Sequence, residues 1–241
     1  MKTVPKLALR ALYVCASAAL LGGCHGAQVG FSPPGVVALG PGKEYLARRA
    51  CPEAPAGRAQ CGVLILNERP QNNEPGWGAR DIEAAYNLPS SSKGLGQIVA
   101  IIDAYDNPNV ASDLAVYRQQ YGLPPAKLYK YNQDGEQSNY PQGNPSWGVE
   151  IDLDTQMVSA SCPKCTIYLI EANADADADF DTAEAEAVTL GAHITTNSWL
   201  CRPSTCVDRR DFDTPGVRMS FAPSLWHARL AVAAPVRLCE A

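Results

Sequence analysis

Amino-acid patterns between residues 98 and 199 predict an α/β fold with a doubly wound, mostly parallel sheet. Short apolar runs alternate there with stretches of helical length. The first run, Ile98–Ile102, is apolar at every position, which is typical of a strand buried on both faces of a parallel sheet. Alternation of this kind indicates crossover connections between parallel strands. With 46% hydrophobic content, the 241-residue chain can bury one such core.

The expected elements follow one another with recognisable beginnings and ends. Gly96 and Gln97 precede the first strand, and the polar Asp103 ends it. Gly191 follows the third helix at its C′ position, where a left-handed residue commonly ends a helix. In such sheets chemistry collects at the carboxyl ends of the strands, where Asp103 and Trp199 are expected. Helices are expected over residues 109–121, 150–161 and 181–190, and further strands over 128–131, 166–172 and 194–199.

The regions that flank the predicted sheet differ from it in composition. Residues 1–24 are expected to be an export signal, because Lys2, Lys6 and Arg10 precede the apolar residues 11–21. Residues 25–75 are rich in Pro and Gly, and we expect a loosely structured leader there. The domain itself is expected to occupy residues 76–216 and to be followed by an aberrant tail over 217–241.

The end of the signal allows two kinds of processing. Leu21-Gly22-Gly23-Cys24 resembles a bacterial lipobox, in which Cys24 would be lipidated and would anchor the protein. The alternative is ordinary cleavage near Gly26 or Ala27, and the sequence leaves both open. Either route predicts a secreted, periplasmic or cell-envelope protein, and no segment of the mature chain is apolar for long enough to span a bilayer.

The charge pattern argues against a nucleic-acid partner. The formal net charge is -5, and the Lys and Arg residues are scattered along the chain. Proteins that bind nucleic acids usually gather these residues into a basic stripe.

The cysteines support an oxidising compartment. Three close pairs predict local disulfides: Cys51 with Cys61, Cys162 with Cys165, and Cys201 with Cys206. Cys162-Pro-Lys-Cys165 would also fit a redox motif or half of a zinc site. A second CxxC and a ligand-spaced histidine are both absent from the sequence, which favours a structural disulfide.

Two carboxylates, Glu150 and Asp154, are the first candidates for chemistry. Four residues apart on a predicted helix, they lie on one face, one turn from each other. Burial of two like charges in one site raises the pKa of a carboxyl group and makes it a plausible general base. The alternative is that these acids only favour the positive end of the helix macrodipole in its first turns.

Further segments surround this pair in a characteristic order. They are Gly76–Pro89, Gly96–Pro108, Cys162–Ala172 and Gly191–Trp199. Over roughly residues 75–216 the chain resembles the sedolisin (serine-carboxyl peptidase) family. The resemblance implies a subtilisin-like fold in which Glu150 is the catalytic base and Asp154 orients it, and a peptide or protein as substrate.

The same resemblance assigns auxiliary roles to residues at the strand ends. It implies that Asp103 is hydrogen-bonded to the catalytic pair and that the Trp199 indole N–H joins this network. The alternatives are a helix-capping carboxylate and a half-buried core aromatic. Asn197 and Ser198 would pair with the substrate backbone by β-augmentation. Leu200 and Cys201 replace glycines of the family pattern, so a narrower or blocked groove is expected.

Other patterns point away from metals and cofactors. The run Asp175-x-Asp177-x-Asp179-x-Asp181 superficially fits a calcium loop, but Phe180 stands where the loop needs glycine. A solvated acidic segment that enters a helix explains it better. The histidines His25, His193 and His227 offer no catalytic triad. We therefore expect neither a metal nor a cofactor.

The predicted catalytic domain is incomplete. The family supplies its nucleophile and its oxyanion aspartate from Gly-Thr-Ser and Ser-Gly-Asp segments, and neither occurs in this sequence. After Gly216 the resemblance ends, as a frameshift would explain, and Ser220 and Ser224 remain only formal nucleophile candidates. The sequence thus predicts an exported sedolisin-like endopeptidase that is inactive as written. The alternative is a non-catalytic exported or lipid-anchored peptide-binding protein.

Overall fold

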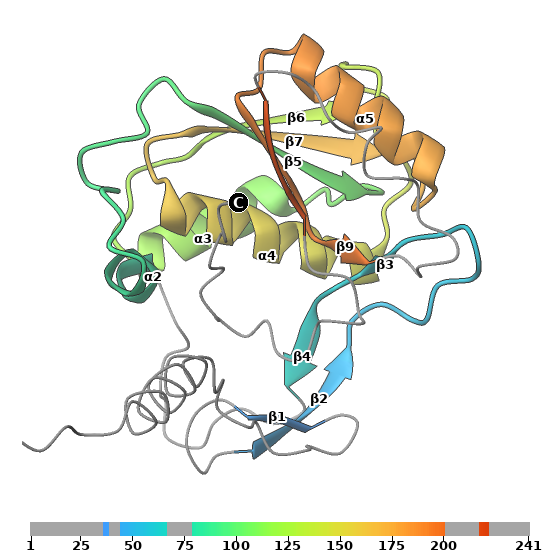
Figure 1. The fold of residues 1–241 in the computed structure, drawn as a ribbon, viewed down its shortest axis with the longest axis horizontal. Helices are drawn as coiled ribbons and strands as arrows, with labels where there is room; N and C mark the ends of the chain where they lie inside the picture. Colours follow the sequence, from blue (N-terminus) through green and yellow to red (C-terminus); the bar gives the residue numbers. More distant parts are fainter. Residues whose placement is uncertain (1–35, 39–43, 67–78, 201–216, 222–241) are drawn as a thin grey trace, which may run out of the picture. The chain divides into compact units, whose positions relative to one another are not determined.

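The computed structural model describes residues 36–38, 44–66, 79–200 and 217–221 (Figure 1). The chain divides into two compact units, Met1–Val36 and Val37–Ala241. The fold below is that of the second unit. Among the described residues, no helix has the length and apolar character needed to cross a membrane.

A parallel sheet of five strands forms the centre of the fold. Its order is β10-β8-β5-β7-β6, and every neighbouring pair is parallel. The predicted α/β class with a parallel sheet is therefore confirmed. The strands are β5 (Ile98–Ala104), β6 (Lys127–Asn132), β7 (Thr166–Ala172), β8 (Ile194–Asn197) and β10 (Arg218–Phe221).

Helices cover both faces of this sheet. Helices α2 (Ala79–Ala85), α3 (Val110–Gln120) and α4 (Pro145–Ser161) lie on one face, and α5 (Asp177–Thr189) lies on the other (Figure 1). Successive residues of β5 pack against opposite layers. Ile101 joins the core with α3 and α4, whereas Ala100 and Ile102 join the core with α5. Burial on both faces explains why β5 is apolar without alternation.

One crossover connection differs from the other two. The connections β5–α3–β6 and β6–α4–β7 pass over the same face but run along the sheet in opposite directions, so their hands are opposite. The β7–α5–β8 connection passes over the other face and has the hand of β5–α3–β6. Because crossovers are almost always right-handed, β6–α4–β7 is the left-handed one. It places α4 against the central strands β5 and β7.

Short strands occur where the sequence analysis expects a loosely structured leader. Strands β1 (Val36–Ala38), β2 (Glu44–Arg49) and β4 (Leu64–Leu66) form one small sheet in the order β1-β2-β4. Strand β3 (Gln60–Cys61) pairs antiparallel with β9 (Trp199–Leu200). The Pro and Gly residues here mark turns between short strands, and the small or apolar residues between them are buried: Cys51, Ala59, Cys61 and Val63.

Several boundaries differ from the expected ones. Helix α4 begins at Pro145, five positions before residue 150, because Asn144 caps it: the side-chain oxygen accepts hydrogen bonds from Ser146 N at 3.0 Å and Trp147 N at 3.3 Å. The last predicted strand is split at Ser198 into β8 and β9. The sheet also extends past Gly216, since Arg218–Phe221 forms β10 at its edge.

Candidate active site

Helix α4 presents Glu150 and Asp154 to the interior of the protein. The helix buries one stripe along its length, made of residues 147, 150, 151, 154, 155, 159 and 160, as expected for spacings of three and four positions. Glu150 is 2% exposed and Asp154 is 7% exposed. Because α4 begins at Pro145, neither acid lies in its first turn. The macrodipole alternative therefore does not account for this pair.

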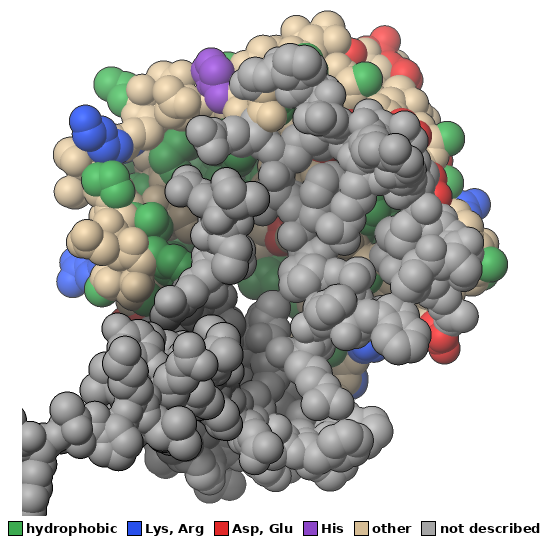
Figure 2. Space-filling model, viewed as in Figure 1, with side chains coloured by type: hydrophobic (Ala, Val, Ile, Leu, Met, Phe, Trp, Pro, Cys, Tyr) green, Lys and Arg blue, Asp and Glu red, His purple; other side chains and the backbone are tan. Residues whose placement is uncertain are grey.

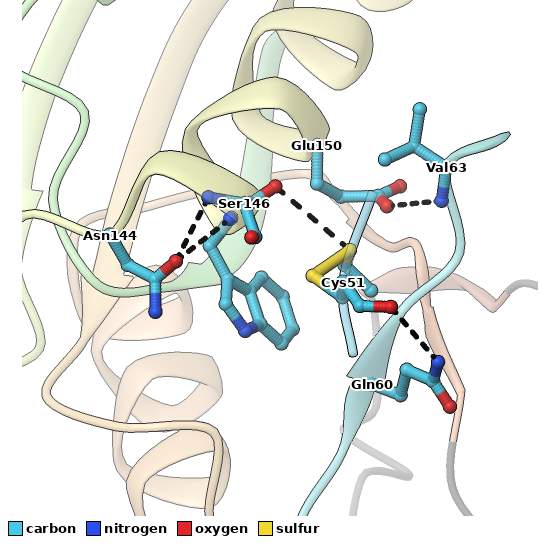
Figure 3. The surroundings of a disulfide bond; sticks show 8 residues. Cys51, Gln60, Val63, Asn144, Ser146 and Glu150 are labelled. Atoms are coloured by element: carbon cyan, nitrogen blue, oxygen red, sulfur yellow. Dashed lines mark hydrogen bonds between the residues drawn. A yellow bond between two sulfur atoms is a disulfide. The ribbon is translucent and has the colours of Figure 1, made fainter. Parts of the chain in front are cut away.

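The Glu150 carboxylate is bonded to backbone of a distant segment. Its Oε2 accepts a hydrogen bond from Val63 N at 2.7 Å, and Gly62 N–H also donates to the carboxylate (Figure 3). Burial and the adjacent Asp154 charge raise the pKa of Glu150 to about 8, against the two backbone bonds, which lower it. Glu150 is thus a carboxyl that keeps its proton near neutral pH.

Asp154 shares this buried environment. Burial raises its pKa to about 7, although a hydrogen bond from the Ser198 side chain works in the opposite direction. Its Oδ2 has no hydrogen-bond partner among the described residues. An oxygen buried without a donor is satisfied most readily by holding a proton itself.

Asp103 completes a group of three acids. It lies near the carboxyl end of β5, is fully buried, and has no hydrogen-bond partner for either carboxylate oxygen within the described ranges. Burial raises its pKa well above the ordinary value, and the charges of Asp154, Glu150 and Glu171 add to the effect. The three carboxyls can hold and exchange protons, as general acid–base chemistry requires.

Trp199 and Asn197 form a different set of contacts. The Trp199 indole Nε1 donates to Asn197 Oδ1 at 3.2 Å, and Asn197 Nδ2 donates to Glu184 Oε1 at 2.6 Å. The Trp199 ring stacks on Phe180 with 4.3 Å between ring centroids. Both contacts connect Trp199 to helix α5. Among the residues predicted to bind substrate or to support the acid pair, Ser198 forms a hydrogen bond to the pair, through Asp154.

The strand edge predicted to pair with substrate is already paired within the chain. Asn197 pairs with Phe221 of β10, and Trp199 pairs with Cys61 of β3. Leu200, which stands where the family pattern has glycine, is buried and pairs with Gln60. Cys201 lies outside the described residues.

Two of the predicted disulfides are present. Cys51 is bonded to Cys61 and Cys162 to Cys165, with Cα–Cα distances of 5.7 and 5.4 Å. Gly94, at φ 91°, lies against the second disulfide, where a side chain would overlap Cys162 Sγ. The pair Cys201–Cys206 and the predicted lipidation site Cys24 lie outside the described residues.

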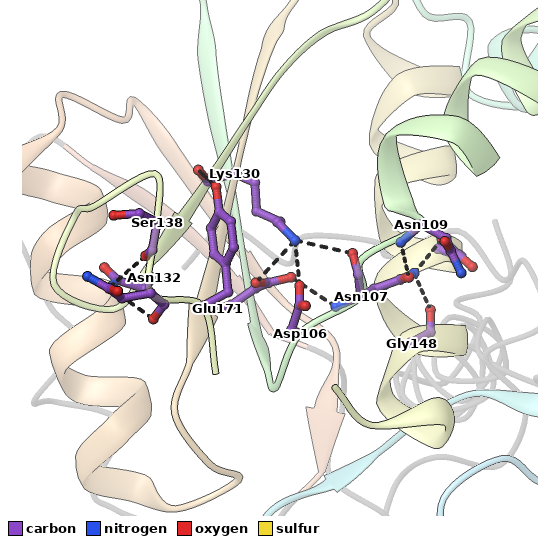
Figure 4. Close-up of polar contacts among 11 residues, drawn as sticks. Asp106, Asn107, Asn109, Lys130, Asn132, Ser138, Gly148 and Glu171 are labelled. Atoms are coloured by element: carbon purple, nitrogen blue, oxygen red, sulfur yellow. Dashed lines mark hydrogen bonds and ion pairs between the residues drawn. The ribbon is translucent and has the colours of Figure 1, made fainter. Parts of the chain in front are cut away.

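A second polar cluster lies beside the acid group, and sequence reasoning missed it. Glu171 of β7 is the register partner of Asp103 and is fully buried. Its Oε1 accepts a hydrogen bond from Asn107 N at 3.1 Å, and Lys130 Nζ lies 3.8 Å from Oε2 (Figure 4). Lys130 also forms an ion pair with Asp106. The sequence did contain a signal for Glu171: like Asp103, it is a charged residue near the end of an otherwise apolar strand.

The acidic run at residues 175–181 has structural partners. Asp175 forms an ion pair with Arg58 at 2.9 Å and accepts a hydrogen bond from Tyr105 Oη at 3.1 Å. Asp177 and Asp179 lie in the first turn of α5, where negative charge favours a helix. In the described part of the chain, no three His, Cys, Asp or Glu side chains are arranged to hold a metal.

The described residues on the face shown in Figure 2 carry no concentrated patch of positive charge. On the face shown in Figure 2, Lys and Arg side chains of the described residues are scattered around the rim. This distribution agrees with the scattered basic residues of the sequence.

Comparisons with known proteins find similarity among solved structures only. No protein-family model matches the chain, and no curated protein matches it. Among solved structures, the chain is similar to Pseudomonas sedolisin, a serine-carboxyl proteinase complexed with two molecules of pseudo-iodotyrostatin, at 19% sequence identity and a TM-score of 0.41. The similarity covers 50% of this chain and 34% of that one, so the chain spans about a third of its length.

Proposed function

We propose that Glu150 and Asp154 are the acid–base pair of a serine-carboxyl type of peptidase site whose substrate is a peptide or protein. The observation that supports this most is a pair of buried carboxyls, one helical turn apart, with pKa values raised to about 8 and 7. Buried acids that have no cation beside them are uncommon unless chemistry requires them.

In this proposal the ionised form of Glu150, which becomes dominant above its pKa of about 8, accepts the proton of a hydroxyl nucleophile and returns it to the leaving nitrogen. Asp154 orients Glu150 and shares the proton. Asp103, whose pKa is raised by burial and by the charges of Asp154 and Glu150, is a third buried carboxyl that can hold a proton beside the pair. The Val63 N–H, 2.7 Å from Glu150 Oε2, supports the view that a peptide nitrogen can reach this carboxyl.

The nucleophile and the oxyanion site are absent from the sequence as given. It contains no Gly-Thr-Ser and no Ser-Gly-Asp segment, and we propose that the chain by itself does not hydrolyse peptide bonds. Loss of one oxyanion donor alone slows such enzymes by about 10² to 10³-fold. Of the formal nucleophile candidates, Ser220 belongs to β10 and Ser224 lies outside the described residues.

Incubation of the purified chain with a denatured protein between about pH 3 and 9, a range that spans the pKa of Glu150, tests this part of the proposal. We expect no fragments from the wild type or from Glu150→Gln. Hydrolysis that Glu150→Gln abolishes would show that the chain holds a complete site, and Ser220→Ala and Ser224→Ala would then locate the nucleophile.

A second candidate is a non-catalytic peptide-binding protein that is exported or lipid-anchored. The lack of both family segments favours it over an active enzyme. Export and anchoring through Cys24 belong to either proposal. The mass and N-terminal residue of the mature protein, recovered from cell-envelope and medium fractions, would test them.

A further inference from the structure

A loop of this chain, which we call the plug loop (Cys51–Val63), lies where a peptide would have to bind. A bound peptide needs a strand edge to pair with and a position next to the acid–base group. The plug loop has both. Its Gln60 and Cys61 pair antiparallel with Leu200 and Trp199, and its Val63 N donates to Glu150.

The peptide bond between Gly62 and Val63 is the part of the loop closest to the acid pair. Both of these residues donate backbone N–H groups to Glu150. At Gly62 an added Cβ would lie 3.1 Å from Ser198 O and 3.9 Å from Glu150 Oε1. A side chain here would require Ser198 to shift by a few tenths of an ångström, so this close approach of the backbone to the strand edge favours glycine.

Aromatic residues form the floor beneath the plug loop. Ala59 and Cys61 are fully buried in the cluster that contains Trp147, Phe180 and Trp199. Phe180 also packs against Trp147, with 6.1 Å between ring centroids. An extended peptide with small residues at alternate positions could pack against these aromatic side chains in the same way as Ala59 and Cys61.

Two kinds of contact hold the plug loop in place. The Cys51–Cys61 disulfide closes it on itself (Figure 3). At its far side, Ala59 N donates to Asp175 O at 2.7 Å, and Arg58 forms an ion pair with Asp175 at 2.9 Å. The covalent closure leaves few alternative conformations for residues 52–60 and favours the bound one.

We propose that the plug loop is an internal ligand that occupies the peptide-docking edge, and that its own sequence shows which peptides the edge accepts. This inference rests on the proposed function, because it gives Glu150 and the Ser198–Leu200 edge their role in peptide binding. The expected ligand is extended, carries small residues at alternate positions, and has glycine immediately before the bond that faces Glu150.

The test compares three forms of the full chain: wild type, Cys51→Ser/Cys61→Ser, and Cys162→Ser/Cys165→Ser as the matched control. The probe is a fluorescein-labelled Ala-Gln-Ser-Gly-Val peptide, with Ala-Gln-Ser-Leu-Val as its control. Binding is followed by anisotropy. Hydrogen exchange is followed at the amides of residues 60–63 and at those of the core strands β5 and β7.

We expect the Cys51→Ser/Cys61→Ser variant to raise exchange at residues 60–63 by at least about tenfold without a change in β5 and β7. This variant should bind the glycine peptide and not the leucine peptide, whereas the wild type and the control variant bind neither. A Gly62→Val variant, whose branched side chain crowds Ser198 O and is expected to loosen the loop, should also bind the glycine peptide. Because this variant keeps the Cys51–Cys61 disulfide, it tests the proposal even if the variant without the disulfide fails to fold.

Binding of neither peptide by both loop variants, with β5 and β7 still protected, would overturn the proposal and make the plug loop an ordinary part of the core. An equal rise of exchange in the loop and in the core strands of both variants would overturn it as well. Neither peptide binding nor hydrogen exchange depends on catalysis. A failure of Glu150 as a base would therefore appear only in the hydrolysis and titration experiments.

Discussion

Two groups of acids lie side by side at the carboxyl ends of β5 and β7, all of them buried except the half-buried Asp106, and they are stabilised in opposite ways. Glu171 and Asp106 share the ammonium group of Lys130, which lies between them. Glu150, Asp154 and Asp103 form no ion pair with Lys or Arg in the part of the chain that the structure describes. The first group resembles a structural ion-pair network, whereas the second must hold protons in order to stay buried.

The pKa of Glu171 shows that burial by itself does not separate the groups. Burial raises this pKa to about 8, as for Glu150, although the Asn107 N–H and Lys130 oppose the shift. The two groups differ in the charged side chains beside their carboxyls: Lys130 lies beside Glu171, whereas Asp154 lies beside Glu150. A carboxyl with a cation beside it has a fixed role in the fold, and a carboxyl beside other carboxyls can pass a proton on.

The largest expected effect is a loss of stability with rising pH that depends on the uncompensated acids. Glu150 has a folded-state pKa of about 8 against an ordinary value of 4.5, so the folded state holds its proton more tightly. The stabilisation that protonated Glu150 gives the folded state is complete below about pH 4.5 and is lost as the pH rises to about 8. It amounts to about 5 kcal/mol at most. Glu150→Gln, which cannot ionise, should flatten this dependence in urea unfolding at pH 5 and pH 8.5.

Glu83→Gln on helix α2 is the matched control, since Glu83 is not part of either acid group. It should leave the pH dependence of the free energy of unfolding unchanged. Equal slopes for wild type and Glu150→Gln would show that Glu150 ionises normally in the folded protein and would remove the main support for its role as a base.

Removal of the cation should convert the structural group into an uncompensated one. Lys130→Met leaves Asp106 and Glu171 without their shared partner and should destabilise the protein by about 3 kcal/mol at neutral pH. The loss should grow as the pH rises through about 8, where Glu171 gives up its proton in the wild type. Urea unfolding at about pH 6 and about pH 9 measures both values, and a loss that is the same at both would contradict the assignment of Lys130 as charge compensation.

Neutralisation of Asp154 should lower the pKa values of its neighbours Glu150 and Asp103 and leave that of Glu171 unchanged. Because the Asp154 charge is the second cause of the raised pKa of Glu150, Asp154→Asn should lower that pKa. Carbon-detected NMR titration of labelled glutamate side chains measures it directly. Glu171, whose raised pKa has other causes, serves as an internal control and should titrate as in the wild type. An unchanged Glu150 titration would mean that the two carboxyls are not electrostatically coupled.

The smallest effect concerns the helix that carries the acid pair. Asn144 caps α4 through hydrogen bonds from Ser146 N and Trp147 N. Asn144→Ala should lower the free energy of unfolding by about 1 kcal/mol. Asn144→Ser should restore most of it, because serine also caps helices. The titration of Glu150 should be unaffected by either variant, and a shift there would show that the cap also sets the geometry of the acid pair.

The sequence alone was sufficient for features that depend on neighbouring residues. The apolar run at 98–102 predicted a central buried strand, and the spacing of Glu150 and Asp154 placed both acids on one face of a helix. The short separations of Cys51 from Cys61 and of Cys162 from Cys165 indicated the two disulfides that the structure contains. Strand periodicity, helical spacing and short loop closure are local properties, so they can be read from one segment at a time.

Only the tertiary structure decided which remote segments meet. Val63 donates to Glu150 across 87 positions of sequence, and Cys61 pairs with Trp199 although nothing in either segment specifies the other. Two further features also depend on contacts between remote segments. One is the addition of Arg218–Phe221 to the sheet, and the other is the division of neighbouring acids into a lysine-paired group and a proton-holding group. Such contacts depend on the left-handed path of α4 and on which surfaces remain to be buried once the sheet has formed. The pattern of residues in one segment does not show which of the other segments will cover it.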